Sequence, residues 1–401
     1  MFTGGGAAWP RVRSLRPARA APVIQYRPRL PSGICLELDI MAHANGGAIE
    51  EPKLSRNFKS DNVTPACAPI MAAINAANLG SVPSYGGDDL TRQLQTAASD
   101  VFGTEVAIFP VTTGTAANAL ALSQITPPYG AVYCHRAAHI ATDECGAPEL
   151  FTGGAKIIGF PSPDGKITPE QLAGAIAFAE DMGVHHVKPG AVSLSQATEW
   201  GTVYELTEVS ALAAVARQQG LPMHMDGARF ANALVHLGCT PAAATWQSGI
   251  DVLSLGATKN GALCAEAVVF FDPARARDFE RRRKRAGHLW SKLRFVSAQL
   301  LAYFDDGLWL ANARHANAMA SSLAEGLRSV RGASLLQAVD ANEVFVALPE
   351  TTVAALENQG FEFYRWPLSA APAGVAIRLV TSYATPQGQV EEFVTAAQRC
   401  N

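Results

Sequence analysis

The sequence lacks three features that would place it in a broad class of proteins. Its longest uninterrupted apolar runs fall far short of the roughly 20 residues that cross a bilayer, so no membrane span is predicted. A formal net charge of −3 at pH 7 provides no overall field that would attract nucleic acid. The seven cysteines are scattered without a C-x-x-C pair, which argues against zinc and redox motifs and favours reduced thiols in a cytoplasmic protein.

The first 55 residues have no acidic side chain before Glu37, although they contain six arginines and many prolines, glycines and alanines. This composition predicts a largely disordered N-terminal extension. An organellar transit peptide is the alternative interpretation, but the segment has little serine and no clear amphipathic period.

The remaining sequence predicts an α/β protein. With 401 residues, of which 48% are hydrophobic and 17% charged, the chain can bury a large core and is expected to form two lobes. From Val106 onward, short apolar runs alternate with helical stretches, which predicts parallel crossovers and a sheet covered by helices on both faces. The predicted strands comprise residues 106–109, 131–134, 156–160, 191–194, 222–226, 252–255 and 267–271, and the predicted helices include 115–124, 169–181 and 207–219.

After residue 306 the pattern changes to an Ala-rich helix, two strands near residues 343–348 and 375–380, and a closing helix. This change predicts a smaller α+β domain. We therefore expect an extension over residues 1–55, a large domain over residues 56–306 and a small domain over residues 307–401.

An aspartate and a lysine form the most informative pair in the sequence. Asp226 closes a short apolar strand in the segment M-H-M-D-G-A-R, and Lys259 follows 33 positions later in a loop of small residues. An enzyme that uses pyridoxal phosphate (PLP) needs both groups, because the lysine forms the Schiff base and the aspartate pairs with the pyridinium nitrogen. The alternative role for Asp226 is to cap the next helix.

The segment T-T-G-T-A-A-N, residues 112–118, follows a predicted strand and opens a helix. Hydroxyls and free backbone N–H groups at a helix N-terminus bind phosphate, so Thr113, Gly114 and Thr115 are candidate ligands of the cofactor phosphate. By itself the motif is also typical of an ordinary helix cap, but its place ahead of Asp226 and Lys259 favours phosphate binding.

Two further polar residues are candidates for the site. Arg378 is a lone cation in a predicted strand of the small domain, where a substrate carboxylate would pair with it; a surface acid at a sheet edge is the alternative partner. His139 follows the predicted strand 131–134 and so falls near the same rim of the sheet as Asp226. A lone histidine is more often structural, but here we expect it to stack on the cofactor ring and to transfer protons.

The basic run R-R-R-K-R at residues 281–285 would suit nucleic acid. Acidic Asp278 and Glu280 lie beside it, and the whole chain is slightly acidic. We therefore interpret the run as a solvated helix face.

Taken together and in this order, the motifs resemble those of the low-specificity L-threonine aldolases, PLP-dependent lyases of fold type I. The likeness runs from about Phe58 to the C-terminus. It implies a PLP-dependent transferase-like large domain with a mainly parallel sheet, plus the smaller α+β domain. It also implies cleavage of β-hydroxy-α-amino acids such as threonine, allo-threonine or phenylserine to glycine and an aldehyde, with Lys259 as the Schiff-base lysine. No metal is implied.

The resemblance also assigns roles to individual residues. K-S-D-N-V-T at residues 59–64 looks like the family's opening signature, in which Ser60 would bind the substrate carboxylate together with Arg378. His139 matches the histidine that stacks on the cofactor. Arg229 matches the arginine of the family's H-x-D-G-A-R motif, which lies in the cofactor site.

Two assignments involve a second subunit. Y-G-G-D-D at residues 85–89 resembles the loop that brings Tyr85 toward the substrate site of a neighbour, and Arg294 resembles an arginine that reaches a neighbour's phosphate. The resemblance therefore implies a homodimer or homotetramer.

One stretch departs from the family pattern. Many of these aldolases carry a histidine before a Gly-rich turn, whereas Thr198 occupies that position in S-Q-A-T-E-W-G, residues 195–201. The base for the substrate's β-hydroxyl is therefore open among His139, Glu199 and water. The alternative activities are those of an aminotransferase, a β-eliminating lyase or a non-catalytic PLP-binding protein, because fold alone does not separate them.

Overall fold

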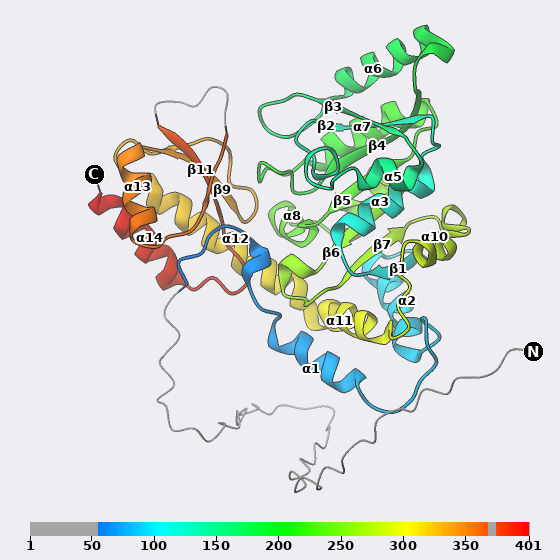
Figure 1. Ribbon diagram of the computed structural model, residues 1–401, viewed down its shortest axis with the longest axis horizontal. Helices are drawn as coiled ribbons and strands as arrows, with labels where there is room; N and C mark the ends of the chain where they lie inside the picture. Colours follow the sequence, from blue (N-terminus) through cyan, green and yellow to red (C-terminus); the bar gives the residue numbers. More distant parts are fainter. Residues whose placement is uncertain (1–54, 368–373, 401) are drawn as a thin grey trace, which may run out of the picture. The chain divides into compact units, whose positions relative to one another are not determined.

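The computed structural model describes residues 55–367 and 374–400 (Figure 1). The extension predicted for residues 1–55 lies outside this range except for Ser55. Within the described residues, none of the helices has the length and hydropathy of a membrane span. The six cysteines in the described ranges are all free thiols.

A seven-stranded sheet forms the larger part of the fold, with the strand order β1-β7-β6-β5-β4-β2-β3. The strands are β1 (Ala107–Val111), β2 (Gly130–His135), β3 (Lys156–Phe160), β4 (Lys188–Ser195), β5 (Met223–Gly227), β6 (Val252–Gly256) and β7 (Glu266–Phe270). All seven predicted strands are confirmed.

The direction of β7 differs from the prediction of parallel crossovers. β7 runs antiparallel to both of its neighbours, β6 and β1, while the other neighbouring strands are parallel. The connection from β6 to β7, residues 257–265, is shorter than the dozen or so residues that a parallel crossover requires. As a result, β7 begins at the edge of the sheet where the parallel strands end.

Helices pack on both faces of this sheet, as Figure 1 shows. On one face, α3 (Gly114–Ile125) and α10 (Phe279–Arg285) share a core with β1, β6 and β7. The other face is covered by α2 (Asp89–Phe102), α6 (Pro169–Met182), α7 (Leu206–Gln218), α8 (Phe230–Leu237) and α11 (Arg294–Phe304). The predicted helices 115–124, 169–181 and 207–219 correspond to α3, α6 and α7 within two residues at each end.

The basic run lies in α10 and is only partly solvated. Arg283 is buried, and it donates to the Pro110 carbonyl at 3.0 Å and to both oxygens of Glu280 at 2.9 Å. The interpretation as a solvated face is therefore wrong for Arg283, because its side chain turns inward beside the Phe109 ring.

A second, antiparallel sheet has the order β10-β11-β9-β8. It consists of β8 (Ser334–Leu335), β9 (Glu343–Leu348), β10 (Tyr364–Arg365) and β11 (Val375–Val380), and it packs with α12 (Leu308–Leu327), α13 (Glu350–Asn358) and α14 (Gln387–Arg399) around a separate apolar core. This is the expected α+β pattern. The division of the chain at residue 306 stays a prediction.

Side-chain alternation along β5 decides which polar groups meet. Met223 and Met225 enter the core on the α2 side, so His224 and Asp226 point to the α3 side. His224 is completely buried between two serines of the adjacent strands, with Nδ1 2.8 Å from Ser193 Oγ and Nε2 2.9 Å from Ser254 Oγ. Burial lowers the pKa of His224 from 6.5 to about 4.

This histidine is expected to destabilise the fold in acid. His224 takes up a proton near pH 6.5 in the unfolded chain but only near pH 4 in the folded chain. Lowering the pH from 6.5 to 4 therefore reduces the free energy of unfolding by about 3 kcal/mol. Urea unfolding of wild type and His224→Asn at several pH values measures the effect. The variant should lose this part of the pH dependence, whereas His185→Asn, at an exposed position, should retain it. An equally steep decline in His224→Asn would contradict the assignment.

Candidate active site

A cavity of about 360 Å³ lies at the edge of the seven-stranded sheet where β1, β4 and β5 end. This is the edge at which open α/β sheets place their ligands. The cavity brings together seven of the residues predicted from the sequence, namely Thr113, Gly114, Thr115, His139, Asp226, Arg229 and Lys259. It does not include Ser60, Tyr85, Arg294 or Arg378 among its lining residues.

Asp226 presents a buried carboxylate to the cavity. Its Oδ1 accepts the N–H of Ala228 at 3.0 Å, and its Oδ2 accepts from Nδ2 of Asn118 at 2.7 Å. The first bond is a local turn contact of the kind expected for an aspartate that follows a strand. The second comes from α3, so the helix that opens at the proposed phosphate loop also orients the carboxylate.

His139 begins the short helix α4 (His139–Thr142) and is held by a buried acid. Its Nδ1 lies 2.8 Å from Oε1 of Glu144, and that oxygen also accepts from Nδ2 of Asn118 at 2.8 Å. The hydrogen bond to Glu144 raises the pKa of His139. Asn118 therefore links the histidine pair to Asp226, and the three side chains form one network.

Lys259 lies in a single 3-10 turn, η4 (Thr258–Asn260), directly after β6. The turn is fixed by Glu266, the first residue of β7, whose two carboxylate oxygens accept the N–H groups of Ala257 at 3.1 Å and Thr258 at 3.3 Å. Burial raises the pKa of Glu266 to about 7. The reversed direction of β7 is what brings this acid to the turn that carries the lysine.

The small residues before Lys259 have a packing role. A Cβ atom at Gly256 would lie 2.5 Å from the backbone oxygen of Ala228, too close for any side chain. Glycine at this position therefore allows the end of β6 to approach the loop that follows Asp226, and this brings the lysine and the aspartate to the same cavity.

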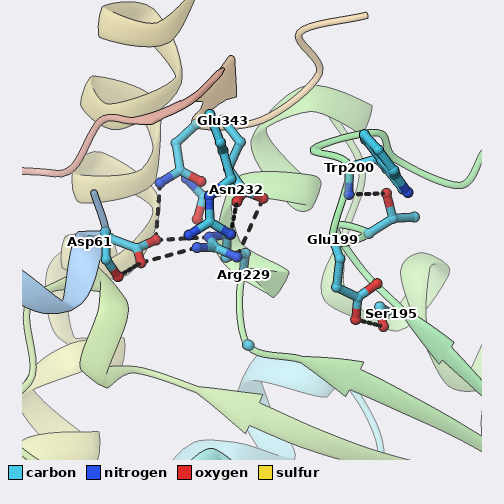
Figure 2. Close-up of polar contacts among 12 residues, drawn as sticks. Asp61, Ser195, Glu199, Trp200, Arg229, Asn232 and Glu343 are labelled. Atoms are coloured by element: carbon cyan, nitrogen blue, oxygen red, sulfur yellow. Dashed lines mark hydrogen bonds and ion pairs between the residues drawn. The ribbon is translucent and has the colours of Figure 1, made fainter. Parts of the chain in front are cut away.

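Arg229 is enclosed by two acids from distant parts of the chain, as Figure 2 shows. Its Nε donates to Oδ2 of Asp61 at 2.8 Å, and its Nη1 lies 3.4 Å from Oε2 of Glu343 on β9. Asn342 also donates to Oδ2 of Asp61, at 3.1 Å. Burial alone would raise the pKa of Asp61, but the Arg229 guanidinium holds this pKa below its usual range. The cluster ties η1 (Asp61–Val63), the cavity and the four-stranded sheet together.

Ser60 and Arg378 lie next to this cluster but not in the cavity lining. Ser60 caps η1, where its hydroxyl accepts the N–H of Asn62 at 3.1 Å. Arg378 donates to the Lys59 carbonyl at 3.3 Å, and its Nη1 lies 3.7 Å from Oε1 of Glu343. The Nε of Arg378 is buried and has no hydrogen-bond partner. The two predicted ligands of a substrate carboxylate thus come from adjoining segments, and Arg378 keeps a free donor.

Tyr85 and Arg294 occupy a different surface. The Tyr85 N–H donates to the Ser291 carbonyl at 3.1 Å, and Nη1 of Arg294 donates to the Gly80 carbonyl at 3.3 Å. Half of the Tyr85 side chain is exposed. The two residues assigned to a neighbouring subunit's site are therefore held by contacts between the same two segments of this chain, residues 80–85 and 291–294.

Comparison with known proteins shows the family. The sequence model that describes the β-eliminating lyases matches residues 57–351 of this chain. The chain belongs to the β-eliminating lyase family. A low specificity L-threonine aldolase of a Pseudomonas species is 41% identical over 339 residues, which cover 84% of this chain and 96% of that protein. Another from Pseudomonas aeruginosa is 43% identical over 310 residues, which cover 77% and 89% of the respective chains.

A solved structure supports the same placement in the β-eliminating lyase family. The threonine aldolase of Leishmania major is 28% identical in sequence and superposes with a TM-score of 0.80. The superposition covers 86% of this chain and 98% of that protein. The fold is therefore that of the PLP-dependent enzymes of fold type I, as the sequence motifs predict.

The β-eliminating lyase family depends on PLP, and the cavity fits that cofactor. It offers the amine of Lys259, the carboxylate of Asp226 and the N-terminus of α3, which are the groups that PLP requires for its aldehyde, ring nitrogen and phosphate. The cavity residues also include buried polar atoms without hydrogen-bond partners, Asn118 Oδ1 and Glu199 Oε2. A polar ligand would satisfy such atoms.

Proposed function

We propose that the protein cleaves L-threonine, L-allo-threonine and related β-hydroxy-α-amino acids such as phenylserine to glycine and an aldehyde. The observation that carries the proposal is the convergence of Lys259 and Asp226 in one cavity, in a chain 41–43% identical to low specificity L-threonine aldolases. A cytoplasmic location is part of the same proposal, on the basis of the unpaired cysteines in the described ranges.

PLP bound here would supply an electron sink for the pair left on Cα when the Cα–Cβ bond breaks. Lys259 would provide the amine that binds the cofactor, and Asp226 would keep its ring nitrogen protonated. Thr113, Gly114 and Thr115 bind the phosphate at the N-terminus of α3. His139, held in place by Glu144, would stack on the cofactor ring. Arg229, paired with Asp61, shapes the wall of the cavity beside Asp226.

Arg378 and Ser60 are the proposed ligands of the substrate carboxylate. The guanidinium of Arg378 lies over the rings of Tyr364 and Trp366, with its carbon 5.2 and 4.9 Å from their centroids. These contacts leave its unpartnered Nε as a donor for an anion. By holding the carboxylate, these residues would orient the amino acid in the cavity and so favour cleavage of one bond to Cα over the others.

We also propose a homodimer or homotetramer in which Tyr85 and Arg294 serve the cavity of a partner. Apolar side chains are exposed close to these residues, with 53% of Leu263 and 41% of Trp290 accessible. Both lie on a groove with Ser291 and Phe295, and exposed apolar surface of this kind is typical of subunit contacts. Sedimentation of the purified protein would measure the assembly, and a monomer would contradict it.

The function is tested by incubating purified protein and PLP with L-threonine, L-allo-threonine and L-phenylserine. Equal amounts of glycine and aldehyde are expected. Product analysis and the visible spectrum of the bound cofactor together separate the alternatives. A keto acid with ammonia would indicate a β-eliminating lyase, and a keto acid with conversion of the cofactor to pyridoxamine phosphate would indicate an aminotransferase. Either result would overturn the aldolase proposal.

A further inference from the structure

We propose that Glu199 is the catalytic base that takes the β-hydroxyl proton of the substrate. The inference rests on the proposed aldol cleavage and adds a role for a residue in the loop after β4, where this chain departs from the family pattern. It is carried by the hydrogen bonds of the acids that line the cavity.

One oxygen of Glu199 is fixed and the other is free. Oε1 accepts from the Ser195 hydroxyl at 2.6 Å and from the N–H of His139 at 2.8 Å, and the contact with Ser195 is drawn in Figure 2. Oε2 is buried and has no hydrogen-bond partner. A buried acceptor without a donor is unfavourable, and a substrate hydroxyl in the cavity would supply the missing donor.

The other carboxylates of the cavity have no free oxygen. Among the lining residues in the described ranges, the acids are Glu199, Asp226 and Glu266. Both oxygens of Asp226 accept hydrogen bonds, from Asn118 and Ala228, and both oxygens of Glu266 accept backbone N–H groups. Among these three acids, only Glu199 has an oxygen without a hydrogen-bond partner.

Thr198 and His139 are less suited to the role of the base than Glu199. Thr198, which we align with the family's histidine, is completely buried and bonds to Thr202 Oγ1 at 2.7 Å. His139 has its Nδ1 held by Glu144, in the arrangement expected of a residue that stacks on the cofactor. Thr198 is not among the lining residues of the cavity, and the bond to Glu144 suits His139 to stacking on the cofactor, which leaves Glu199 to accept the hydroxyl proton.

The surroundings bring the pKa of Glu199 close to the pH at which a general base works best. Burial, the largest effect, and the charge of Asp226 raise its pKa to about 7, although the hydrogen bonds from Ser195 and His139 oppose this. The other titratable groups that act on it are Arg229, beyond β5, Cys134 on β2 and Tyr204, after β4. A base with a pKa near the working pH transfers protons most efficiently.

The step balances without a further reactant. The β-hydroxyl proton moves to Oε2 of Glu199, and the O–H electron pair becomes the second carbon–oxygen bond of the aldehyde. The Cα–Cβ bond breaks and leaves its pair on Cα, which then takes up one proton to give glycine. Glu199 returns its proton to water before the next turnover.

The test is Glu199→Gln, which keeps an oxygen able to accept from Ser195 and His139 but cannot accept a proton. Two reactions are compared: aldehyde release from L-threonine or L-phenylserine, and exchange of the α-proton of glycine in D2O, followed by NMR. The second uses the same cofactor site without a β-hydroxyl. Cleavage is expected to fall at least about 10²-fold while glycine exchange and the cofactor spectrum are unchanged. Glu180→Gln, on the exposed side of α6, is the matched control.

The pH profile provides a second readout. In the wild type, kcat/KM for cleavage should rise through about pH 7 as Glu199 loses its proton, and this rise should be absent in the variant. Normal cleavage in Glu199→Gln would overturn the assignment. An equal loss of both reactions would also overturn it, since Glu199 would then only shape the cavity. A wild type that exchanges glycine but releases no aldehyde would instead overturn the proposed function, and with it the role of Glu199.

Discussion

Replacing Lys259 by alanine is expected to leave the fold intact and to lower aldehyde release at least about 10⁴-fold. No other lysine lines the cavity in the described part of the chain, so no other amine is placed to bind the cofactor covalently. The side chain is partly exposed to the cavity, while its turn is fixed by backbone bonds to Glu266, and alanine preserves those bonds. Aldehyde release and the visible cofactor spectrum are the measurements.

Lys156→Ala is the matched control for this variant. Lys156 is the exposed first residue of β3, at the opposite edge of the same sheet, so its loss should change neither the activity nor the spectrum. Circular dichroism would establish that both variants are folded. If Lys259→Ala kept wild-type turnover, the assignment of the cavity as a PLP site would be wrong.

Asp226→Asn should reduce kcat by about 10³-fold while the protein still binds cofactor. The amide has nearly the shape of the carboxylate and keeps an oxygen that can accept from Asn118, but it carries no negative charge. The cofactor's ring nitrogen would then lose the charge that holds its proton. The measurement is kcat at saturating substrate with added PLP, together with the amount of cofactor retained after gel filtration.

Asp251→Asn serves as the comparison for Asp226→Asn. Asp251 accepts the N–H of Met223 at 2.8 Å at the opposite end of β5, so its replacement tests the strand without touching the cavity. It should lower stability and leave kcat per folded molecule unchanged. If Asp226→Asn lowered kcat no more than Asp251→Asn did, Asp226 would have only the local role of a turn residue.

The fold was largely predictable because short apolar runs and helical stretches alternate regularly. β3 matches its predicted range, residues 156–160, and the other strands of the large sheet differ by a few residues at their ends. The direction of β7 was not predictable from periodicity, which is the same for parallel and antiparallel strands. The short connection after Lys259 was the available signal, since it is too short for a crossover.

The candidate site was predictable at positions where the residue type and its place in the sequence together indicate the chemical role. Lys259 and the Thr113–Thr115 loop come just after their strands and Asp226 lies at the end of β5, so chain position alone brings them to the same edge. The acids that position them were missed. Glu144 and Glu266 are buried carboxylates fixed by a side chain and by backbone N–H groups, respectively, and no local pattern marks such contacts.

Asp61 and Glu343 were missed for a related reason. They meet Arg229 only because three distant segments converge, and sequence spacing gives no information about such a contact. The N-terminal signature 59–64 pointed to Ser60, whereas the side chain that reaches the cavity's arginine is the adjacent Asp61. A buried arginine requires acidic partners, so Arg229 itself was the signal that acids had to be sought elsewhere.

The convergence on Arg229 has a consequence for the order in which the protein matures. Asp61 precedes Arg229 by 168 residues and Asn342 by 281, so the ribosome makes the members of this cluster at widely separated times. Because domains begin to fold during synthesis, the seven-stranded sheet can assemble while β9 has not yet left the ribosome. Until then, Arg229 and Asp61 lack Glu343 and Asn342. Arg229 and Asp61 can therefore gain all of these partners only after residues 342 and 343 have been synthesised.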